Sequence, residues 1–282
     1  MINELPFMTG DFRHDAKAAS ELIGYVIVFS VIVATVILVT LTATPIIDNE
    51  QSEESARAVE NSFLQIDKSV TTVQSGATNQ FIEVEMPAGQ LRQLDETQIT
   101  FSQSATGDSI TINTRPMQYT TKEGQTVVYN ARFIASSPHA DAGPNTHIRH
   151  LPTESHMTKN PVMRIPELKH PTGKSAYASS RARVVPFEIN RTNNDQQARS
   201  EIFLDDPDNS GTTEPDENVE ITITSEVPNA WEAYLNEHAA FTSVSHTDGT
   251  DTVTATVDFT ALEGDRFIVT SHEIETVFGQ RL

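Results

Sequence analysis

The sequence predicts an α+β protein, in which a long N-terminal transmembrane helix extends into an amphipathic helix and a mainly antiparallel β-rich ectodomain with one short late helix follows. Three observations predict this class. An uncharged, apolar run extends from Leu22 to Ile47, a helical stripe of apolar residues follows it as far as Gly76, and short segments of alternating polarity fill the remainder of the 282 residues. The length suits about two domains.

The first element is a predicted transmembrane helix over residues 19–47. Its centre, Leu22–Leu41, is long enough at about 1.5 Å per residue to match the roughly 30 Å hydrocarbon core of a bilayer. Arg13 and Lys17 precede the run and Asp48 follows it. The positive-inside rule then predicts a single-pass protein of the plasma membrane with a cytoplasmic N-terminus and an extracellular C-terminal part.

The second element is an amphipathic helix over residues 48–76. Apolar residues recur there at steps of three and four, which places them on one face of a helix, and Gly76 is a suitable stop signal. The stripe consists of Ala56, Val59, Phe63, Ile66, Val70 and Val73.

The remainder, residues 77–282, is predicted to be a β-rich extracellular domain. The predicted strands are Phe81–Met86, Gln98–Ser102, Ser109–Asn113, Val127–Phe133, Val162–Ile165, Arg183–Ile189, Val219–Ser225, Thr252–Phe259 and Phe267–Ile274. They follow one another without intervening helices, which favours antiparallel pairing. One short helix is expected at Pro228–His238, and long loops are expected at 136–161, at Pro171–Ser180 and at 205–218.

Composition restricts the function. The formal net charge is −20, with 39 Asp and Glu against 19 Lys and Arg, so the field of the protein repels nucleic acid. An acidic surface of this kind suits high salt, which screens the repulsion, so a halophilic source is expected, although an ordinary acidic protein would also fit. The absence of Cys excludes disulfides and thiolate chemistry.

The segment Lys17–Val26, KAASELIGYV, resembles the class III (prepilin-type) signal of haloarchaeal type IV pilin-like proteins. The resemblance implies that residues 1–18 are a basic cytoplasmic leader, that a prepilin peptidase cuts between Ala18 and Ala19, and that the helix stays in the mature protein. It assigns processing roles to Lys17, Ala18, Ala19 and Glu21. It also implies that the partners are the membrane, the peptidase with its assembly machinery, and other pilin subunits. An unprocessed signal anchor is the alternative.

The function that follows is that of a membrane-anchored, pilin-like surface protein, a minor pilin or related subunit in surface structure or adhesion. No catalytic motif is present, so an enzyme is not expected. The alternative is a non-pilin, single-span ectodomain that binds a ligand or Ca²⁺.

Three candidate sites accompany this interpretation. The first has the spacing of an EF-hand calcium loop, although a solvated turn would look the same, and its ligands would be Asp206, Asp208, Ser210, Thr212 and Glu217. The second is a histidine group in which metal binding is less expected than a polar loop: His139, His147, His150, His156 and His170. The third is Asn190, in the N-x-S/T sequon Asn190-Arg191-Thr192, as a glycosylation site.

Overall fold

The computed structural model describes residues 12–138, 145–151, 162–169, 176–192, 199–204, 218–238, 240–247, 249–259, 262 and 266–279; for 12–23 and 39–52 it describes only the helical backbone. The chain divides into an N-terminal unit, Met1–Gln51, and a C-terminal unit, Ser52–Leu282. Across the described residues there are two helices and sixteen strands.

Helix α1 (Phe12–Gln74) begins in the N-terminal unit and ends in the C-terminal unit. All six residues of the predicted stripe are buried, five of them completely. The helix ends in a Schellman motif: the N–H of Gly76 donates to the carbonyl of Val73, and that of Ala77 to the carbonyl of Thr72. This motif needs a left-handed residue, and Gly76 supplies a φ of 121°.

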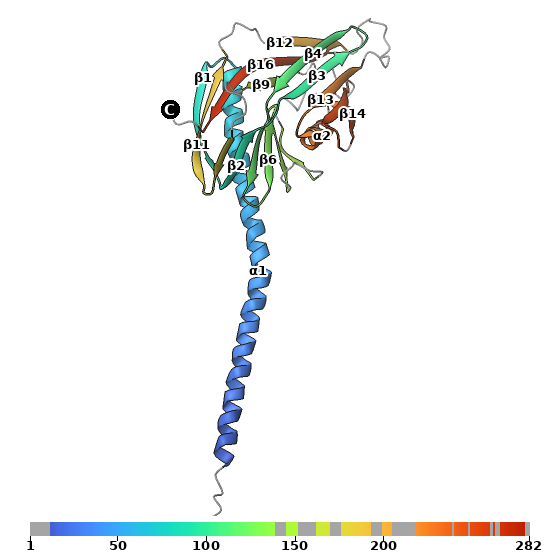
Figure 1. The fold of residues 1–282 in the computed structure, drawn as a ribbon. Helices are drawn as coiled ribbons and strands as arrows, with labels where there is room; N and C mark the ends of the chain where they lie inside the picture. The colour runs from blue at the N-terminus through green and yellow to red at the C-terminus, as the bar shows by residue number, and fades with distance from the viewer. Residues whose placement is uncertain are drawn as a thin grey trace, which may run out of the picture. The chain divides into compact units, whose positions relative to one another are not determined.

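Three sheets build the rest of the C-terminal unit (Figure 1). Sheet A contains β1 (Asn79–Met86), β9 (Val162–Lys169), β11 (Arg183–Arg191), β12 (Arg199–Leu204) and β16 (Arg266–Phe278). Sheet B has the order β10 (Ala176–Ser179), β2 (Gly89–Gln93), β5 (Met117–Thr121), β6 (Thr126–Asn130), β7 (Phe133–Ser137) and β8 (His147–His150). Sheet C has the order β14 (Phe241–His246), β15 (Thr252–Val257), β13 (Val219–Thr224), β3 (Thr97–Gln103) and β4 (Asp108–Thr114).

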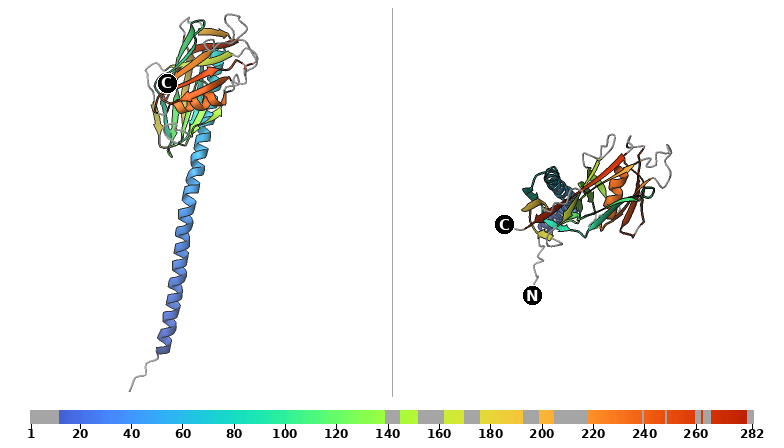
Figure 2. Two further views of the ribbon diagram at one scale, coloured as in Figure 1. Left: turned by 90° about the vertical axis from the view of Figure 1, so that its right-hand side faces the viewer. Right: turned by 90° about the horizontal axis from the view of Figure 1, so that it is seen from above.

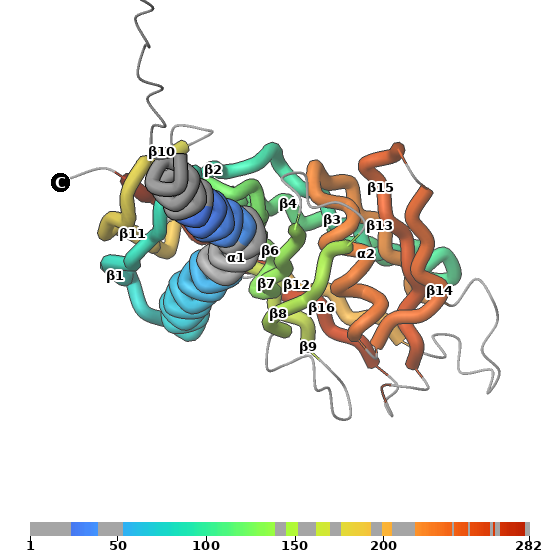
Figure 3. The backbone as a smooth tube through the Cα atoms, turned by 90° about the horizontal axis from the view of Figure 1, so that it is seen from below, coloured from blue at the N-terminus to red at the C-terminus, as the bar shows by residue number. Residues whose placement is uncertain are grey.

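Sheet B forms the middle layer of the C-terminal unit. Every residue of β6 and β7 is buried, because both faces of these strands are covered. On one face Tyr129 and Ile134 share a core cluster with the stripe of α1, and on the other Val128 and Phe133 share a cluster with the short helix α2 (Pro228–Glu237). Figure 3 shows β6, β7 and β8 between β1 and β11 on one side and sheet C on the other.

Helix α2 packs its apolar residues against sheet C and the adjoining strand β7. Pro228 suits its first turn, where the missing N–H has no intrahelical partner. The ring of Phe133 contacts those of Trp231 and Tyr234 at centroid distances of 4.9 and 4.7 Å, which builds an aromatic core. In Figure 2 α2 is the orange helix beside the orange and red strands.

The predicted fold class, α+β with an N-terminal transmembrane helix, is wrong. The described structure is mainly β, since three sheets supply most of both core clusters. In the part of the chain with described side chains, no helix is both long enough and apolar enough to cross a membrane.

The structure contains short strands that the sequence pattern did not predict, so its β content is larger than expected. The segment Val127–Phe133, predicted as one strand, is a hairpin that turns at Ala131 and Arg132. The predicted loop 136–161 contains the end of β7 and all of β8, and Pro171–Ser180 contains β10. All described strand pairs are antiparallel except β9 with β16.

Candidate functional site

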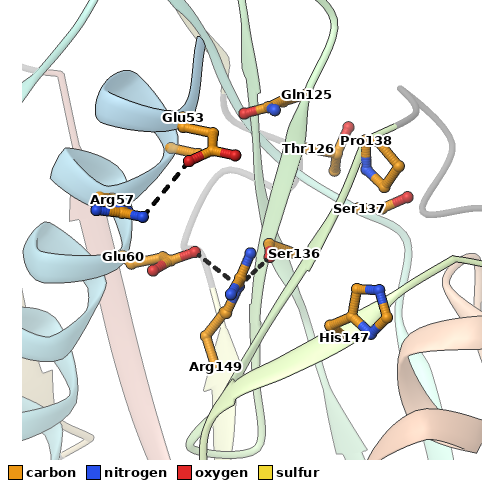
Figure 4. A pocket seen from close by; sticks show the side chains of 11 residues that line it. Glu53, Arg57, Glu60, Gln125, Thr126, Ser136, Ser137, Pro138, His147 and Arg149 are labelled. Carbon is orange, nitrogen blue, oxygen red and sulfur yellow. Dashed lines mark hydrogen bonds and ion pairs between the residues drawn. The ribbon is translucent and has the colours of Figure 1, made fainter. Parts of the chain in front are cut away.

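A cavity of 310 Å³ lies inside the C-terminal unit, between α1 and the strands β6, β7 and β8 (Figure 4). Its walls are mostly polar, with charged side chains on the helix side and hydroxyl and amide groups on the sheet side. The lining residues are Glu53, Ala56, Arg57, Glu60, Gln125, Thr126, Ser136, Ser137, Pro138, His147 and Arg149.

The helix wall comes from the polar side of α1 that borders the buried stripe. Glu53, Arg57 and Glu60 stand four and three residues apart, so they share one face of the helix. Arg57 Nη2 lies 3.4 Å from Glu53 Oε2, and both side chains are about three-quarters exposed. Such an exposed pair adds little stability, so both groups can rearrange around a bound molecule at small cost.

Arg149 enters the cavity from a β-bulge. Ile134 pairs with His150 and Ala135 with Ile148, so the register shift leaves Arg149 as the additional residue of β8. A bulge re-aims a side chain out of the regular alternation. Arg149 Nε donates to Ser136 Oγ at 2.7 Å and lies 3.3 Å from Glu60 Oε1, which ties β8 to both α1 and β7.

Glu60 is the least exposed charged group of the cavity. Burial raises its pKa, and the nearby Arg149 and Arg57 together with a hydrogen bond from Ser136 offset part of that rise. The net effect is that the site makes the ionised carboxylate more costly than in water. A cationic group placed beside Glu60 would therefore be favoured there.

A buried ionic network joins α1 to the β6–β7 hairpin outside the cavity lining. Asp67 of α1 accepts hydrogen bonds from Tyr129 Oη at 3.1 Å and from Arg132 Nε at 3.3 Å. Burial and the neighbouring Asp67 raise the pKa of Tyr129 well above its usual value, so the phenol remains a hydrogen-bond donor. Because Arg132 lies in the β6–β7 turn, the network attaches that hairpin to α1.

The turn itself carries backbone strain. Ala131 and Arg132 have φ values of 44° and 73°, a pair that fits a two-residue type I′ hairpin normally built from Asn and Gly. Residues with side chains hold this conformation only where their surroundings demand it. Here the ion pair to Asp67 and the buried Ala131 supply that demand.

A second buried carboxylate, Glu167, fastens sheet A. It accepts hydrogen bonds from Arg199 of β12 and from Ser271 of β16, the latter at 2.7 Å. These contacts join β9, β12 and β16. We assign this group a structural role, since it does not line the cavity.

The predicted processing residues Lys17, Ala18, Ala19 and Glu21 lie on the helical backbone of α1, in the part whose side chains are not described. The predicted calcium ligands Asp206, Asp208, Ser210, Thr212 and Glu217 lie outside the described residues.

The histidine group is only partly described. His147 and His150 belong to β8, where His147 lines the cavity, whereas His139, His156 and His170 lie outside the described residues. Among the residues that are described, no three His, Asp or Glu side chains gather as metal ligands would.

The sequon residue Asn190 lies on β11, which pairs with β1 and with β16. Its side-chain nitrogen donates to Glu188 Oε1 at 3.1 Å, and the residue is partly buried. A glycan on that nitrogen would have to displace this hydrogen bond.

Sequence reasoning did not find the cavity. The helical phase of the stripe places Glu53 and Glu60 beside the buried face, which was the one available signal. Nothing in the sequence around Arg149 announces a strand with a bulge, because β8 has four residues and lies in a segment rich in turn-forming residues.

Fold and cavity define a β-rich protein with an amphipathic helix packed into its core and a polar, charge-balanced pocket beside that helix. The chain belongs to DUF7289, a family of unknown function, whose sequence profile matches residues 17–277. No curated protein and no solved structure matches the chain.

Proposed function

We propose that the protein is a non-enzymatic, type IV pilin-like subunit that is held at the plasma membrane by its N-terminal part and displays the C-terminal unit outside. It would serve in a surface structure or in adhesion. The observation that carries this proposal is the exposed apolar surface of α1 from Tyr25 to Leu38. We call this stretch the apolar segment.

Large apolar side chains cover the apolar segment on all sides. Tyr25 is 79% exposed, Phe29 68% and Leu38 63%. Leaving such surface in water costs about 25 cal/mol per Å², and contiguous apolar surface marks a site of interaction. A catalytic function does not explain this exposed apolar surface. A subunit that associates with others through its helix explains it.

The hydroxyl groups of the apolar segment support the same proposal. Ser30 Oγ donates to the carbonyl of Val26 at 2.6 Å, and Thr35 Oγ1 donates to that of Val31 at 2.7 Å. Each hydroxyl satisfies its donor within the helix, as polar groups must when water is absent. The apolar segment is thus suited to apolar surroundings, either lipid or neighbouring helices.

Helix α1 connects the apolar segment directly to the C-terminal unit. The helix that carries the apolar segment also provides the buried stripe from Ala56 to Val73.

Processing tests the proposal. The full-length chain is expressed with a prepilin peptidase and, as a control, with a catalytically inactive peptidase, and the membrane fraction is sequenced from its N-terminus. We expect Ala19 as the first residue with the active enzyme only, and no processing of a variant altered at Ala18. An intact N-terminus with the active enzyme would overturn the proposal.

A second candidate function is that of an anchored ectodomain that binds a small ligand without forming assemblies. The cavity beside Glu60 and Arg149 favours it. The two functions separate by crosslinking, because only a subunit of an assembly gives oligomers through the apolar segment.

A further inference from the structure

We infer that the cavity between α1 and β6–β8 is a binding site for a small zwitterion that carries an ammonium and a carboxylate on the same carbon, the pattern of an α-amino acid. This inference deepens the second candidate function, and it does not depend on the proposed assembly function, since it concerns only residues of the C-terminal unit.

The first step concerns charge. The cavity holds two carboxylates, of Glu53 and Glu60, and two guanidinium groups, of Arg57 and Arg149. In a chain of net charge −20, an equal number of both signs at one place is a local departure from the average surface. A ligand of one sign would face repulsion from half of these groups, whereas a ligand with both signs is complementary to all of them.

The second step concerns Arg149. Its Nε is occupied by Ser136 and Glu60, and neither terminal nitrogen has a partner among the described residues. Two terminal N–H groups in one plane match the two oxygens of a carboxylate. Ser136 and Glu60 fix the orientation of this fork in advance, which lowers the entropy lost on binding. Figure 4 shows the guanidinium in the cavity between the helix and the sheet.

The third step concerns Glu60. Glu60 Oε1 lies 3.3 Å from Arg149 Nε. A ligand whose ammonium binds Glu60 and whose carboxylate binds Arg149 must therefore carry the two groups close together. Burial raises the pKa of Glu60, and an adjacent ammonium would offset the cost of keeping it ionised. The α-amino acid is the simplest molecule with this separation.

The fourth step concerns the opposite wall. Thr126, Ser137 and Gln125 supply hydroxyl and amide groups without charge. They suit a short polar side chain, and 310 Å³ is at the lower end of the range for small-molecule sites. L-serine is therefore our probe.

The experiment uses four molecules of nearly equal shape with the full-length chain in detergent micelles. L-serine carries both charges, L-glycerate replaces the ammonium by a hydroxyl, serinol replaces the carboxylate by CH₂OH, and glycerol carries neither charge. Binding is measured by calorimetry and by the shift in thermal midpoint. We expect L-serine to bind at least tenfold more tightly than each of the other three, since charge-assisted hydrogen bonds carry the recognition.

Variants assign the contacts. We expect Arg149→Gln to weaken L-serine at least tenfold and to abolish its advantage over serinol. Glu60→Gln should abolish its advantage over L-glycerate. Arg115→Gln is the matched control. Arg115 does not line the cavity, and its Nη2 lies 3.9 Å from Glu96 Oε2, so this variant should leave the affinity unchanged.

Three results would overturn the inference. Equal binding of glycerol and L-serine would make the cavity a polyol site, and tightest binding of L-glycerate would make it an anion site. The absence of binding by all four molecules at millimolar concentration would mean that the cavity binds no ligand of this class. None of these results bears on N-terminal processing, so the inference and the proposed function can fail separately.

Discussion

Two stretches of the same helix treat apolar side chains in opposite ways. In the apolar segment, Tyr25–Leu38, large apolar residues are exposed around the whole circumference, whereas between Ala56 and Val73 the apolar residues form one stripe that the sheets bury. Both stretches are regular helix. The difference teaches that periodicity, not apolar content, tells whether a helix finds its partner within its own chain: a stripe matches one internal face, and an all-round apolar surface needs partners from outside.

The largest expected effect comes from paired truncations of Phe on the two stretches. Phe63 is fully buried and its ring lies 5.9 Å from that of Tyr129, so Phe63→Ala should lower the free energy of unfolding of the C-terminal unit by about 3–5 kcal/mol. Phe29→Ala removes the same atoms from an exposed site and should change that free energy by less than about 0.5 kcal/mol. Urea unfolding followed by Trp231 fluorescence measures both. Equal effects of the two variants would contradict the comparison.

A somewhat smaller effect is expected from the polar contacts of the buried stretch. Asp67→Asn removes the carboxylate charge that faces Arg132 and Tyr129, and we expect it to cost about 3 kcal/mol because the buried guanidinium loses its ion pair with Asp67. Glu53→Gln breaks the exposed pair with Arg57 on the same helix and should cost less than about 0.5 kcal/mol. The free energies of unfolding of the two variants give the answer, and an Asp67→Asn protein as stable as Glu53→Gln would show that the network stabilises nothing.

An effect of intermediate size on stability is expected from backbone crowding in sheet B. A Cβ at Gly89 of β2 would collide with the carbonyl oxygen of Thr120 and with the ring of Tyr119, whose hydroxyl donates to the carbonyl of Pro87 at 2.6 Å. Gly89→Ala should therefore cost about 1–3 kcal/mol. The added Cβ of Gly24→Ala, one residue before the apolar segment, meets no atom within 4 Å, and this variant should be neutral for the C-terminal unit. Thermal midpoints of the two variants compare them directly.

The smallest expected effect concerns pH. Burial raises the pKa of Glu60 above 4.5 in the folded state, so the folded protein favours the protonated acid. The contribution of Glu60 to stability is therefore complete below pH 4.5 and decreases as pH rises through the raised pKa. Glu60→Gln imitates the protonated form and should remove this decrease.

The measurement is the urea midpoint at pH 4.5 and at pH 7.5. Relative to wild type, Glu60→Gln should gain stability at the higher pH and show no gain at the lower one. Glu53→Gln is the control and should show no such difference. A gain at pH 4.5 alone would reverse the assigned sign.

The sequence predicted the elements that have long-range periodicity or a strong local signal. The stripe from Ala56 to Val73 is buried as expected, Gly76 ends α1, and α2 starts at Pro228. These features follow from helix geometry and from the backbone preferences of Gly and Pro, and both can be predicted from the local sequence.

The remaining features depend on tertiary structure. The hairpin at Ala131 and Arg132 lacks the Asn or Gly that would announce its turn, and an ion pair to the distant Asp67 stabilises it instead. Strand β8 is short, and only its pairing with β7 defines the bulge at Arg149. The cavity brings together residues almost one hundred positions apart, so no local pattern could have shown it. The missed strands are also the reason why the predicted α+β class was wrong.

Self-association through the apolar segment is the central claim, and Gly24→Leu tests it most directly. A Cβ at Gly24 meets no atom within 4 Å, so Leu there causes no collision of its Cβ within the chain, and we expect its effect on oligomers to arise between molecules. We predict that crosslinking of the wild-type protein in cell membranes gives a series of oligomers, and that Gly24→Leu reduces it while the unfolding of the C-terminal unit stays unchanged. Exclusively monomeric protein in both cases would contradict the account.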